Sequence, residues 1–420
     1  MRTRISVGIV IICLLSIYAV LANADDYDWP RWRGPNGDGI SMETDWDPEA
    51  LAGGPKILWK VDTGYGYSNI TIKDNRLFTI GINGMYCLNA ETGEEIWRYS
   101  FAHRLEFQST PTVDSNSVYA LSIGGKLFCW KVKNGKLRWV RDLGSEYDVV
   151  KPYYGFAASP LIDGDTIILT ANNSGLALDK KTGKQIWGSE KPPEKIKGLF
   201  SSSGAHYATP VIHDYEGKRY TALSNYEGLH FVEVETGKVL WTYAWEPYAV
   251  TYATEPLFFD NKVFITRYCE AGCVLLDIGE GEPKVLWENK NLSSDTSSPV
   301  LIDRYIYGCE GGPEMGRCSL RCLHVETGEI MWEEDLRLEG EKRPITASLI
   351  AADGKLIILE DDGTLHIAKA TPTSYQEIAS GNVLEGKPKK TKFWTHPVLC
   401  NGKIYCRNFA GNLVCIDVSR

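Results

Sequence analysis

The sequence lacks the histidine spacings and catalytic turns that mark common metalloenzymes and hydrolases. Its seven histidines form no His-x-His or His-Glu-x-x-His pattern, the kind of spacing that brings two imidazoles to one metal. The stretches "LSIGG" at Gly124 and "NSG" at Ser174 fit hairpin turns, whereas a nucleophile elbow requires a strand-to-helix turn. We therefore assign no catalytic and no metal-binding residue.

The chain also lacks a basic cluster and a second long apolar run. Its formal net charge is −9, and no group of Lys and Arg is interleaved with aromatic residues. An acidic surface repels nucleic acid. Beyond the first 24 residues, no stretch approaches the roughly 20 apolar residues that cross a bilayer. We expect no nucleic-acid partner, and no transmembrane segment once the N-terminal segment is removed.

The N-terminus has the pattern of an export signal. Arg2 and Arg4 precede an apolar run from Ile5 to Leu21, and Ala22-Asn23-Ala24 provides small residues at a cleavage position. We predict that residues 1–24 are a signal peptide and that the protein is periplasmic or otherwise extracytoplasmic. The alternative is an uncleaved membrane anchor, because the apolar run is rather long.

A repeated motif places a Gly in a turn and a Trp four residues later, as in "AETGEEIW", "KTGKQIW" and "ETGKVLW". Glycine adopts positive φ in such a turn without a side-chain clash. A Trp offers a broad apolar face and an N–H that can reach a neighbouring carbonyl. The motif predicts a structural series that docks one sheet onto the next: Trp59, Trp97, Trp139, Trp187, Trp241, Trp287 and Trp332.

Each repeat reads as four short strands, and these tryptophans lie roughly 40 to 54 residues apart, as propeller blades do. The last copy, "HPVLCNGKIYCRNFAGNLVCIDVS", stops after three strands, while "GGPKILWKVDTG" near the N-terminus supplies a lone strand. Pairing the two would close a ring and remove free sheet edges. We expect an all-β, eight-bladed, monomeric propeller of four-stranded antiparallel blades over residues 54–420, preceded by a Trp/Gly-rich leader over residues 25–53.

These repeats resemble the tryptophan-docking motifs of the quinoprotein-like (PQQ-like) propeller family. That group includes dehydrogenases that use pyrroloquinoline quinone (PQQ), and BamB-like subunits of outer-membrane assembly machinery. The leader "DWPRWRGPNGDGIS" resembles the start of exported members of the family. The resemblance covers roughly residues 54–420 and implies the fold more strongly than any activity, because one fold hosts many functions.

The dehydrogenases of this family imply a vicinal Cys-Cys disulfide and calcium ligands, and this sequence has no Cys-Cys pair and no matching ligand stretch. We therefore expect no cofactor and a non-catalytic binding or assembly scaffold that serves an envelope protein or a small polar or carbohydrate ligand. The alternative is a PQQ- and calcium-dependent, or carbohydrate-acting, enzyme with its site on the channel face.

Loops that lead into the innermost strands gather around the channel of a propeller and are rich in polar and aromatic residues here. Convergent groups of this kind suit a small-ligand pocket, although they could equally cap the channel. The candidate ligand-binding residues are Glu106, Lys151, Tyr153, His206, Tyr207, Tyr252, Arg343, Trp394 and His396.

Ten cysteines follow the signal segment. If Ala410-Gly411 is a two-residue turn, Cys406 faces Cys415 across two strands, and Cys309 and Cys318 flank the Gly-rich stretch "EGGPEMGR". We treat Cys406–Cys415 and Cys309–Cys318 as candidate disulfides, with buried free thiols as the alternative.

Overall fold

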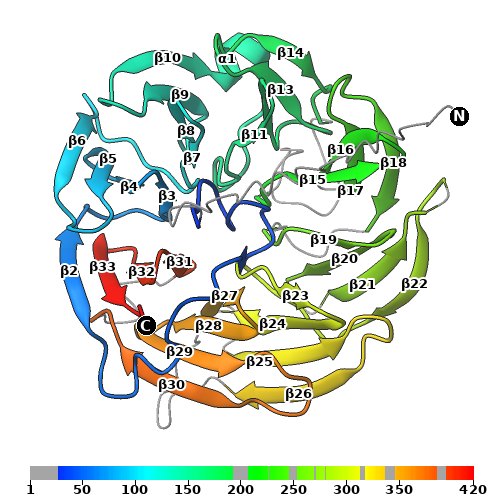
Figure 1. Cartoon of the computed structure of the whole chain (residues 1–420). Coiled ribbons are helices and arrows are strands. Elements are labelled where there is room, and N and C mark those ends of the chain that lie inside the picture. Colours follow the sequence, from blue (N-terminus) through cyan, green and yellow to red (C-terminus); the bar gives the residue numbers. More distant parts are fainter. Residues whose placement is uncertain are drawn as a thin grey trace, which may run out of the picture.

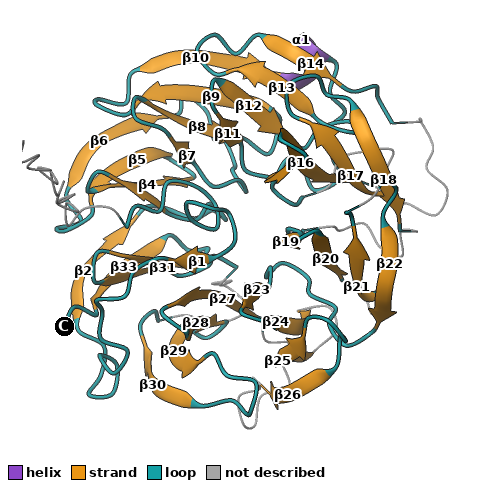
Figure 2. Ribbon diagram, turned by 45° about the vertical axis from the view of Figure 1, so that its right-hand side comes forward, coloured by secondary structure: helices purple, strands orange, loops and turns teal. Residues whose placement is uncertain are grey.

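The structure is a computed structural model that describes residues 27–192, 207–225, 227–245, 253–268, 271–279, 281–312, 317–335, 346–385 and 394–420. Eight sheets are arranged in a ring around a central axis, as Figures 1 and 2 show from two directions. The predicted all-β, eight-bladed propeller is therefore confirmed. The predicted signal peptide at residues 1–24 lies outside the described residues.

The blades follow one another in chain order, and each runs from its innermost to its outermost strand. Blade 1 contains β3 (Thr71–Lys73), β4 (Arg76–Gly81), β5 (Gly84–Asn89) and β6 (Glu95–Ser100). Blade 2 contains β7 (Thr112–Val113), β8 (Ser117–Leu121), β9 (Lys126–Lys131) and β10 (Leu137–Asp142), and the short helix α1 (Leu143–Tyr147) follows it. Blade 3 contains β11 (Leu161–Asp163), β12 (Thr166–Leu169), β13 (Leu176–Asp179) and β14 (Gln185–Gly188). Blade 4 contains β15 (Val211–Tyr215), β16 (Lys218–Ser224), β17 (Gly228–Glu233) and β18 (Val239–Ala244).

The second half of the ring repeats the arrangement. Blade 5 contains β19 (Leu257–Phe259), β20 (Lys262–Arg267), β21 (Gly272–Asp277) and β22 (Lys284–Asn289). Blade 6 contains β23 (Val300–Ile302), β24 (Tyr305–Gly312), β25 (Arg317–His324) and β26 (Ile330–Asp335). Blade 7 contains β27 (Ala347–Ala352), β28 (Lys355–Glu360), β29 (Thr364–Lys369) and β30 (Glu377–Asn382). Blade 8 contains β31 (Val398–Cys400), β32 (Lys403–Arg407) and β33 (Asn412–Asp417), with β2 (Ile57–Asp62) as its outermost strand.

Both ends of the chain close the ring within blade 8. Strand β2 pairs antiparallel with β33, so that Trp59 lies opposite Cys415. The buried guanidinium of Arg407 then holds the chain that leads from β2 into blade 1. It donates to the carbonyls of Gly66 at 2.6 Å, Ser68 at 2.7 Å and Gly64 at 2.9 Å. The predicted N-terminal closing strand is thus confirmed.

The Gly–Trp repeat joins neighbouring blades through direct contact. Gly135 has a φ of +67°, and a Cβ atom built on it would lie 2.4 Å from Cε3 of Trp97 in the preceding blade. The same indole donates its N–H to the carbonyl of Val132 at 2.8 Å. Comparable indole-to-carbonyl bonds reach the next blade from Trp59, Trp187, Trp287 and Trp332. The glycine is needed because the indole ring occupies the space of a side chain.

A β-bulge interrupts the outermost strand of every blade, and in seven of the eight blades a tryptophan follows it. The register of the outermost strand shifts just before Trp59, Trp97, Trp187 and their equivalents. In blade 7 the shift occurs before Ala379, which replaces the tryptophan there. Because bulges disrupt pairing along an edge strand, they protect these outer edges from adding another strand.

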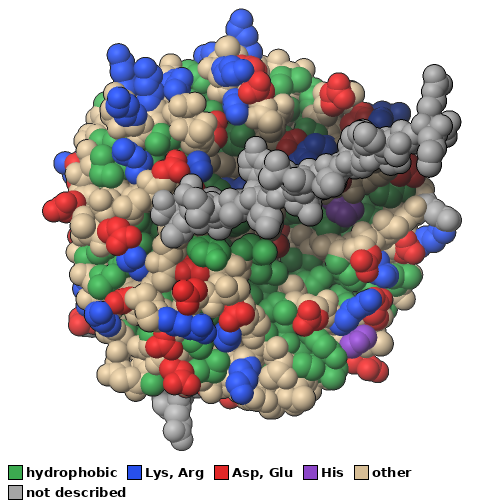
Figure 3. All heavy atoms as spheres, viewed as in Figure 1, with side chains coloured by type: hydrophobic (Ala, Val, Ile, Leu, Met, Phe, Trp, Pro, Cys, Tyr) green, Lys and Arg blue, Asp and Glu red, His purple; other side chains and the backbone are tan. Residues whose placement is uncertain are grey.

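The surface is mixed in charge. On the face shown in Figure 3, the blue Lys and Arg side chains are interspersed with red Asp and Glu side chains. Among the described residues, no helix is long and apolar enough to cross a membrane.

Candidate functional site

A belt of hydrogen bonds links the residues that immediately precede the innermost strands. The backbone N–H of Asn69 donates to the hydroxyl of Thr110 at 3.3 Å, and the N–H of Thr110 donates to Ser159 at 2.9 Å. The N–H of Ser159 donates to Thr209 at 3.1 Å. Each blade therefore satisfies a backbone donor of the blade before it, which a buried N–H group requires. The recurring Ser/Thr-Pro step of the sequence thus has a structural role.

Glu255 replaces the hydroxyl residue at the same position in blade 5 and extends the belt. Its Oε1 accepts from the N–H of Thr209 at 3.0 Å, and its Oε2 accepts from the hydroxyl of Ser298 at 2.5 Å. Its own N–H donates to the Ser298 hydroxyl at 3.1 Å. Only 3% of Glu255 is exposed, so this carboxylate is buried and held by several donors.

The leader crosses the mouth of the channel and contacts blades around the ring. Trp29 pairs with Ile72 of blade 1 through two backbone bonds of 2.9 and 2.8 Å, and Pro30 accepts from Val113 of blade 2. Strand β1 (Ile40–Ser41) then pairs parallel with β27 of blade 7. In Figure 1 this dark blue segment lies in the middle of the ring. The leader is therefore an integral part of the propeller.

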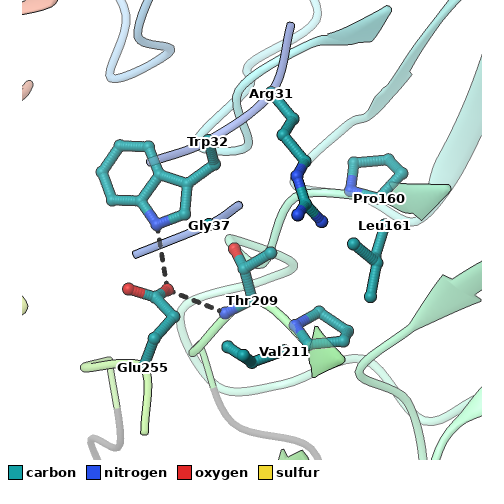
Figure 4. A pocket seen from close by; sticks show the side chains of 9 residues that line it. Arg31, Trp32, Gly37, Pro160, Leu161, Thr209, Val211 and Glu255 are labelled. Carbon is teal, nitrogen blue, oxygen red and sulfur yellow. Dashed lines mark hydrogen bonds between the residues drawn. The ribbon is translucent and has the colours of Figure 1, made fainter. Parts of the chain in front are cut away.

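Within the leader, Trp32 lies beside the belt of hydrogen bonds and contacts its member Glu255. Its indole N–H donates to Oε1 of Glu255 at 2.9 Å, as Figure 4 shows. Its ring stacks on the imidazole of His396, with centroids 4.6 Å apart and an angle of 21° between the planes. A cavity of about 10 Å³ beside Arg31 and Trp32 holds at most one water molecule. The indole thus spans the axis between Glu255 of blade 5 and His396 of blade 8.

Arg33 adds a buried positive charge beside this indole. Its Nη1 donates to the carbonyl of Ser298 at 2.8 Å, its Nη2 donates to that of Pro299 at 2.6 Å, and its Nε lies 3.8 Å from Oε2 of Glu255. Burial lowers the pKa of Arg33, and the charge of Glu255 opposes that shift. The leader is therefore anchored by an ion pair and by carbonyls of blade 6.

His396 is neutral in this environment. Burial, followed by the nearby charge of Arg33, lowers the pKa of His396 to about 3. Neither ring nitrogen has a hydrogen-bond partner among the described residues. A neutral, enclosed imidazole without an orienting carboxylate is poorly placed for proton transfer.

The axial residues do not fit a calcium–quinone site. The described residues contain no group of three or more His, Cys, Asp or Glu side chains that could hold a metal ion. The carboxylate of Glu255 is already committed to Trp32, Thr209, Ser298 and the leader arginine. We therefore derive no reaction step through that cofactor.

The structure describes six of the nine predicted ligand-binding residues, and these contact different neighbours. His396 lies inside the belt, while Trp394 stacks on Tyr67 with centroids 5.2 Å apart. Glu106 is exposed and pairs with Arg104 at 3.2 Å. His206, Tyr252 and Arg343 lie outside the described residues.

Two other predicted residues form an aromatic cluster between blades 3 and 4. Tyr153 is 57% exposed and meets Tyr154 edge-on, with centroids 4.8 Å apart. The hydroxyl of Tyr207 accepts from the N–H of Tyr154 at 3.1 Å, and burial raises the pKa of Tyr207 to about 12. Lys151 is exposed nearby in sequence. Tyr153 and Tyr207 of the predicted set thus share one aromatic cluster through Tyr154.

Sequence reasoning missed Trp32, Arg33 and Glu255. Glu255 stands in "TEP", where other blades have "STP", "ASP" or "ATP". A carboxylate in place of a hydroxyl at a repeated position was the available signal. The leader offered no such signal, because it occurs once and has no repeat to compare with.

The predicted Cys406–Cys415 pairing needs correction. Cys406 lies opposite Val414 and Cys415 lies opposite Tyr405, so their side chains point to opposite faces of the sheet. The turn is one residue longer than assumed, since Arg407 pairs with Leu413. Cys309 and Cys318 are diagonal neighbours on adjacent strands and hydrogen-bond to each other. All four are buried free thiols in the structure.

The described geometry matches known propeller proteins. The model of the family described as outer membrane protein assembly factor BamB matches residues 52–121 and 83–334. Outer membrane protein assembly factor BamB of Salmonella typhimurium is 27% identical over 161 residues, which is 38% of this chain and 34% of that protein. The chain aligns with about a third to two fifths of the length of the first curated relatives that it matches.

Solved structures share the fold at low sequence identity. BamB from Moraxella catarrhalis has a TM-score of 0.60 at 17% identity, over 86% of this chain and 97% of that chain. Quinohemoprotein alcohol dehydrogenase from Comamonas testosteroni has a TM-score of 0.67 at 11% identity, over 93% of this chain and 80% of that one. These similarities establish the propeller and do not separate scaffold from enzyme. Since the family model spans well over half of its residues, this chain belongs to the PQQ-like repeat family described as outer membrane protein assembly factor BamB.

Proposed function

We propose that the protein is an exported, non-catalytic scaffold that presents the loops on one face of its propeller to a protein partner in outer-membrane protein assembly. The observation that carries this proposal is the filled axis. Trp32, bonded to Glu255 and stacked on His396, occupies the position where a channel-face enzyme of this fold would need open space. A closed ring with a filled axis offers its two faces and its outer wall for binding.

The matched relatives support the choice of partner. The relatives that align with this chain include several proteins named outer membrane protein assembly factor BamB. The N-terminal segment has the pattern of an export signal, and the acidic surface disfavours nucleic acid. An extracytoplasmic scaffold agrees with all three features.

The most direct test is photo-crosslinking from the folded, full-length protein. A photoreactive amino acid is placed at Lys151 or Tyr153, which lie in exposed loops preceding an innermost strand, or at Ile186 or Leu240 on outermost strands. All four side chains are exposed, so a difference in crosslinking between the positions shows which part of the propeller contacts the partner. We expect one envelope protein to crosslink from the loop positions and not from the outer strands.

The enzyme alternative predicts that the protein binds PQQ. The scaffold proposal predicts instead that calorimetric titration of the full-length protein with PQQ and calcium gives no saturable binding, because the axial residues are committed to one another. Saturable binding of PQQ, together with no crosslinked protein from the loop positions, would overturn the scaffold proposal.

A further inference from the structure

A groove opens at the seam where the chain ends close the ring. It lies on the face of the propeller that carries the loops preceding the innermost strands. It has a volume of about 490 Å³, within the range of sites that hold small ligands. Four segments from blades 8 and 1 form it: the end of β2, the β4–β5 turn, the chain after β6 and the β32–β33 turn. The side chains that matter below are those of Asp62, Tyr65, Asn83, Phe101 and Arg104.

One wall of the groove is an apolar platform with firm support. Phe101 is half-buried and lines the groove, and its ring stacks on Phe107, with centroids 5.2 Å apart and planes 20° apart. Phe128 packs against both rings at 5.9 and 6.0 Å. Because packing holds the ring of Phe101 in place without a ligand, a ligand that binds there causes little loss of side-chain conformational entropy.

Two of the polar groups of the groove have partners within the protein. The guanidinium of Arg104 lies over the ring of Tyr65, 4.9 Å from its centroid, and its Nη2 is 3.2 Å from Oε1 of Glu106. One oxygen of Asp62 accepts from the N–H of Gly64 at 2.8 Å. The side chain of Asn83 is exposed on the β4–β5 turn. Planar donors and acceptors thus face a shared space.

The charged groups of the groove do not favour an anion. The lining contains one positive charge, Arg104, and one negative charge, Asp62, and Arg104 also pairs with Glu106 beside the groove. The whole chain carries a formal charge of −9. The groove therefore offers no excess positive charge that would hold a phosphate or carboxylate ligand, whereas an uncharged ligand with many hydroxyl groups needs none.

We propose that this groove binds a neutral saccharide. The C–H face of a sugar ring packs on Phe101, and its hydroxyl groups exchange hydrogen bonds with Asn83, Asp62 and Arg104. Aromatic platforms and planar polar side chains complement the two faces of a sugar. This activity is independent of the assembly scaffold proposed above, and either can fail without the other.

The test measures binding of neutral oligosaccharides to the full-length protein by calorimetry and saturation-transfer NMR. The probes are maltotriose, cellotriose and N,N′-diacetylchitobiose, with digalacturonate as the charged comparison. Asn83→Ala and Asp62→Asn remove polar contacts at exposed positions where folding should be unaffected. Phe101→Ala removes the platform, and Asn134→Ala alters an exposed turn residue of blade 2 as the matched control for Asn83→Ala.

We expect at least one neutral probe to bind, with Asn83→Ala and Asp62→Asn each weakening it about tenfold, as the loss of one or two hydrogen bonds would. Asn134→Ala should leave the affinity unchanged. The proposal is overturned if no neutral probe binds, if binding survives Asn83→Ala and Asp62→Asn, or if digalacturonate binds more tightly than every neutral probe.

Discussion

The indole of Trp32 and the imidazole of His396 lie 4.6 Å apart, centroid to centroid, at the axis of an eight-bladed ring. Trp32 comes from a leader outside the repeats, and His396 comes from the last blade. This contact brings together two positions that are more than 360 residues apart in sequence. It joins the leader to the seam where both chain ends meet.

Replacing Trp32 should destabilise the whole ring. Trp32→Ala removes the stack on His396 and the bond to Glu255, and truncation of a large core aromatic costs about 3–5 kcal/mol. Because Trp32 is only partly buried, we expect a value near the lower end. Trp32→Phe keeps an aromatic ring and loses the bond to a charged acceptor, which costs about 1.5–3 kcal/mol. Chemical denaturation of both variants provides the measurement. Equal stability of Trp32→Ala and the wild type would contradict the packing described here.

His396 should make the fold sensitive to acid. Its pKa is about 3 when folded and about 6.5 when unfolded, so the unfolded state binds a proton more readily. Its stabilising contribution is therefore complete above about pH 6.5 and is lost as the pH falls toward 3. The slope approaches about 1.4 kcal/mol per pH unit in that window.

The measurement compares unfolding free energies from pH 7 down to the lowest pH at which the protein stays folded. His396→Phe keeps a ring against Trp32 and removes the titrating group, so its profile should be flatter. His103→Gln, at an exposed position, is the control and should retain the wild-type profile. Parallel profiles for His396→Phe and the wild type would refute the assignment.

The Gly–Trp contact predicts a large difference between two glycine substitutions. Gly135 and Gly217 have similar φ values of +67° and +72°, but a Cβ on Gly135 meets Trp97 at 2.4 Å, while one on Gly217 meets nothing within 4 Å. Gly217→Ala should cost only the left-handed strain of about 1–2 kcal/mol. Gly135→Ala should cost a further 1–3 kcal/mol or so from overpacking. Thermal or denaturant unfolding of the pair would measure this, and equal costs would show that the indole does not need the glycine.

The fold could be predicted because its signals are repeated. Gly135 followed by Trp139 recurs at corresponding positions in other blades, and each copy reinforces the period, the turn and the strand count. The closing strand was predictable because Trp59 stands without three strands before it. Because each weak local pattern recurs in several blades, the patterns together predict the architecture.

The site could not be predicted in the same way. The path of the leader depends on contacts such as Arg33 with Pro299, which no local pattern encodes. The hydroxyl groups of Thr110 and Ser159 accept from backbone N–H groups of the preceding blade, and this role appears only when neighbouring blades are side by side. The Cys406–Cys415 pairing failed because one additional turn residue moves every side chain to the other face.

The central claim is that the leader fills the axis as part of the native ring. Hydrogen–deuterium exchange of the full-length protein, read out for the peptide spanning residues 28–47, tests it most directly. We predict protection comparable to that of the core strands β28 and β32, because the backbone bonds of Trp29 and Ile40–Ser41 join the leader to blades 1 and 7. Exchange as fast as that of an unstructured peptide would contradict it, and the channel would then be open.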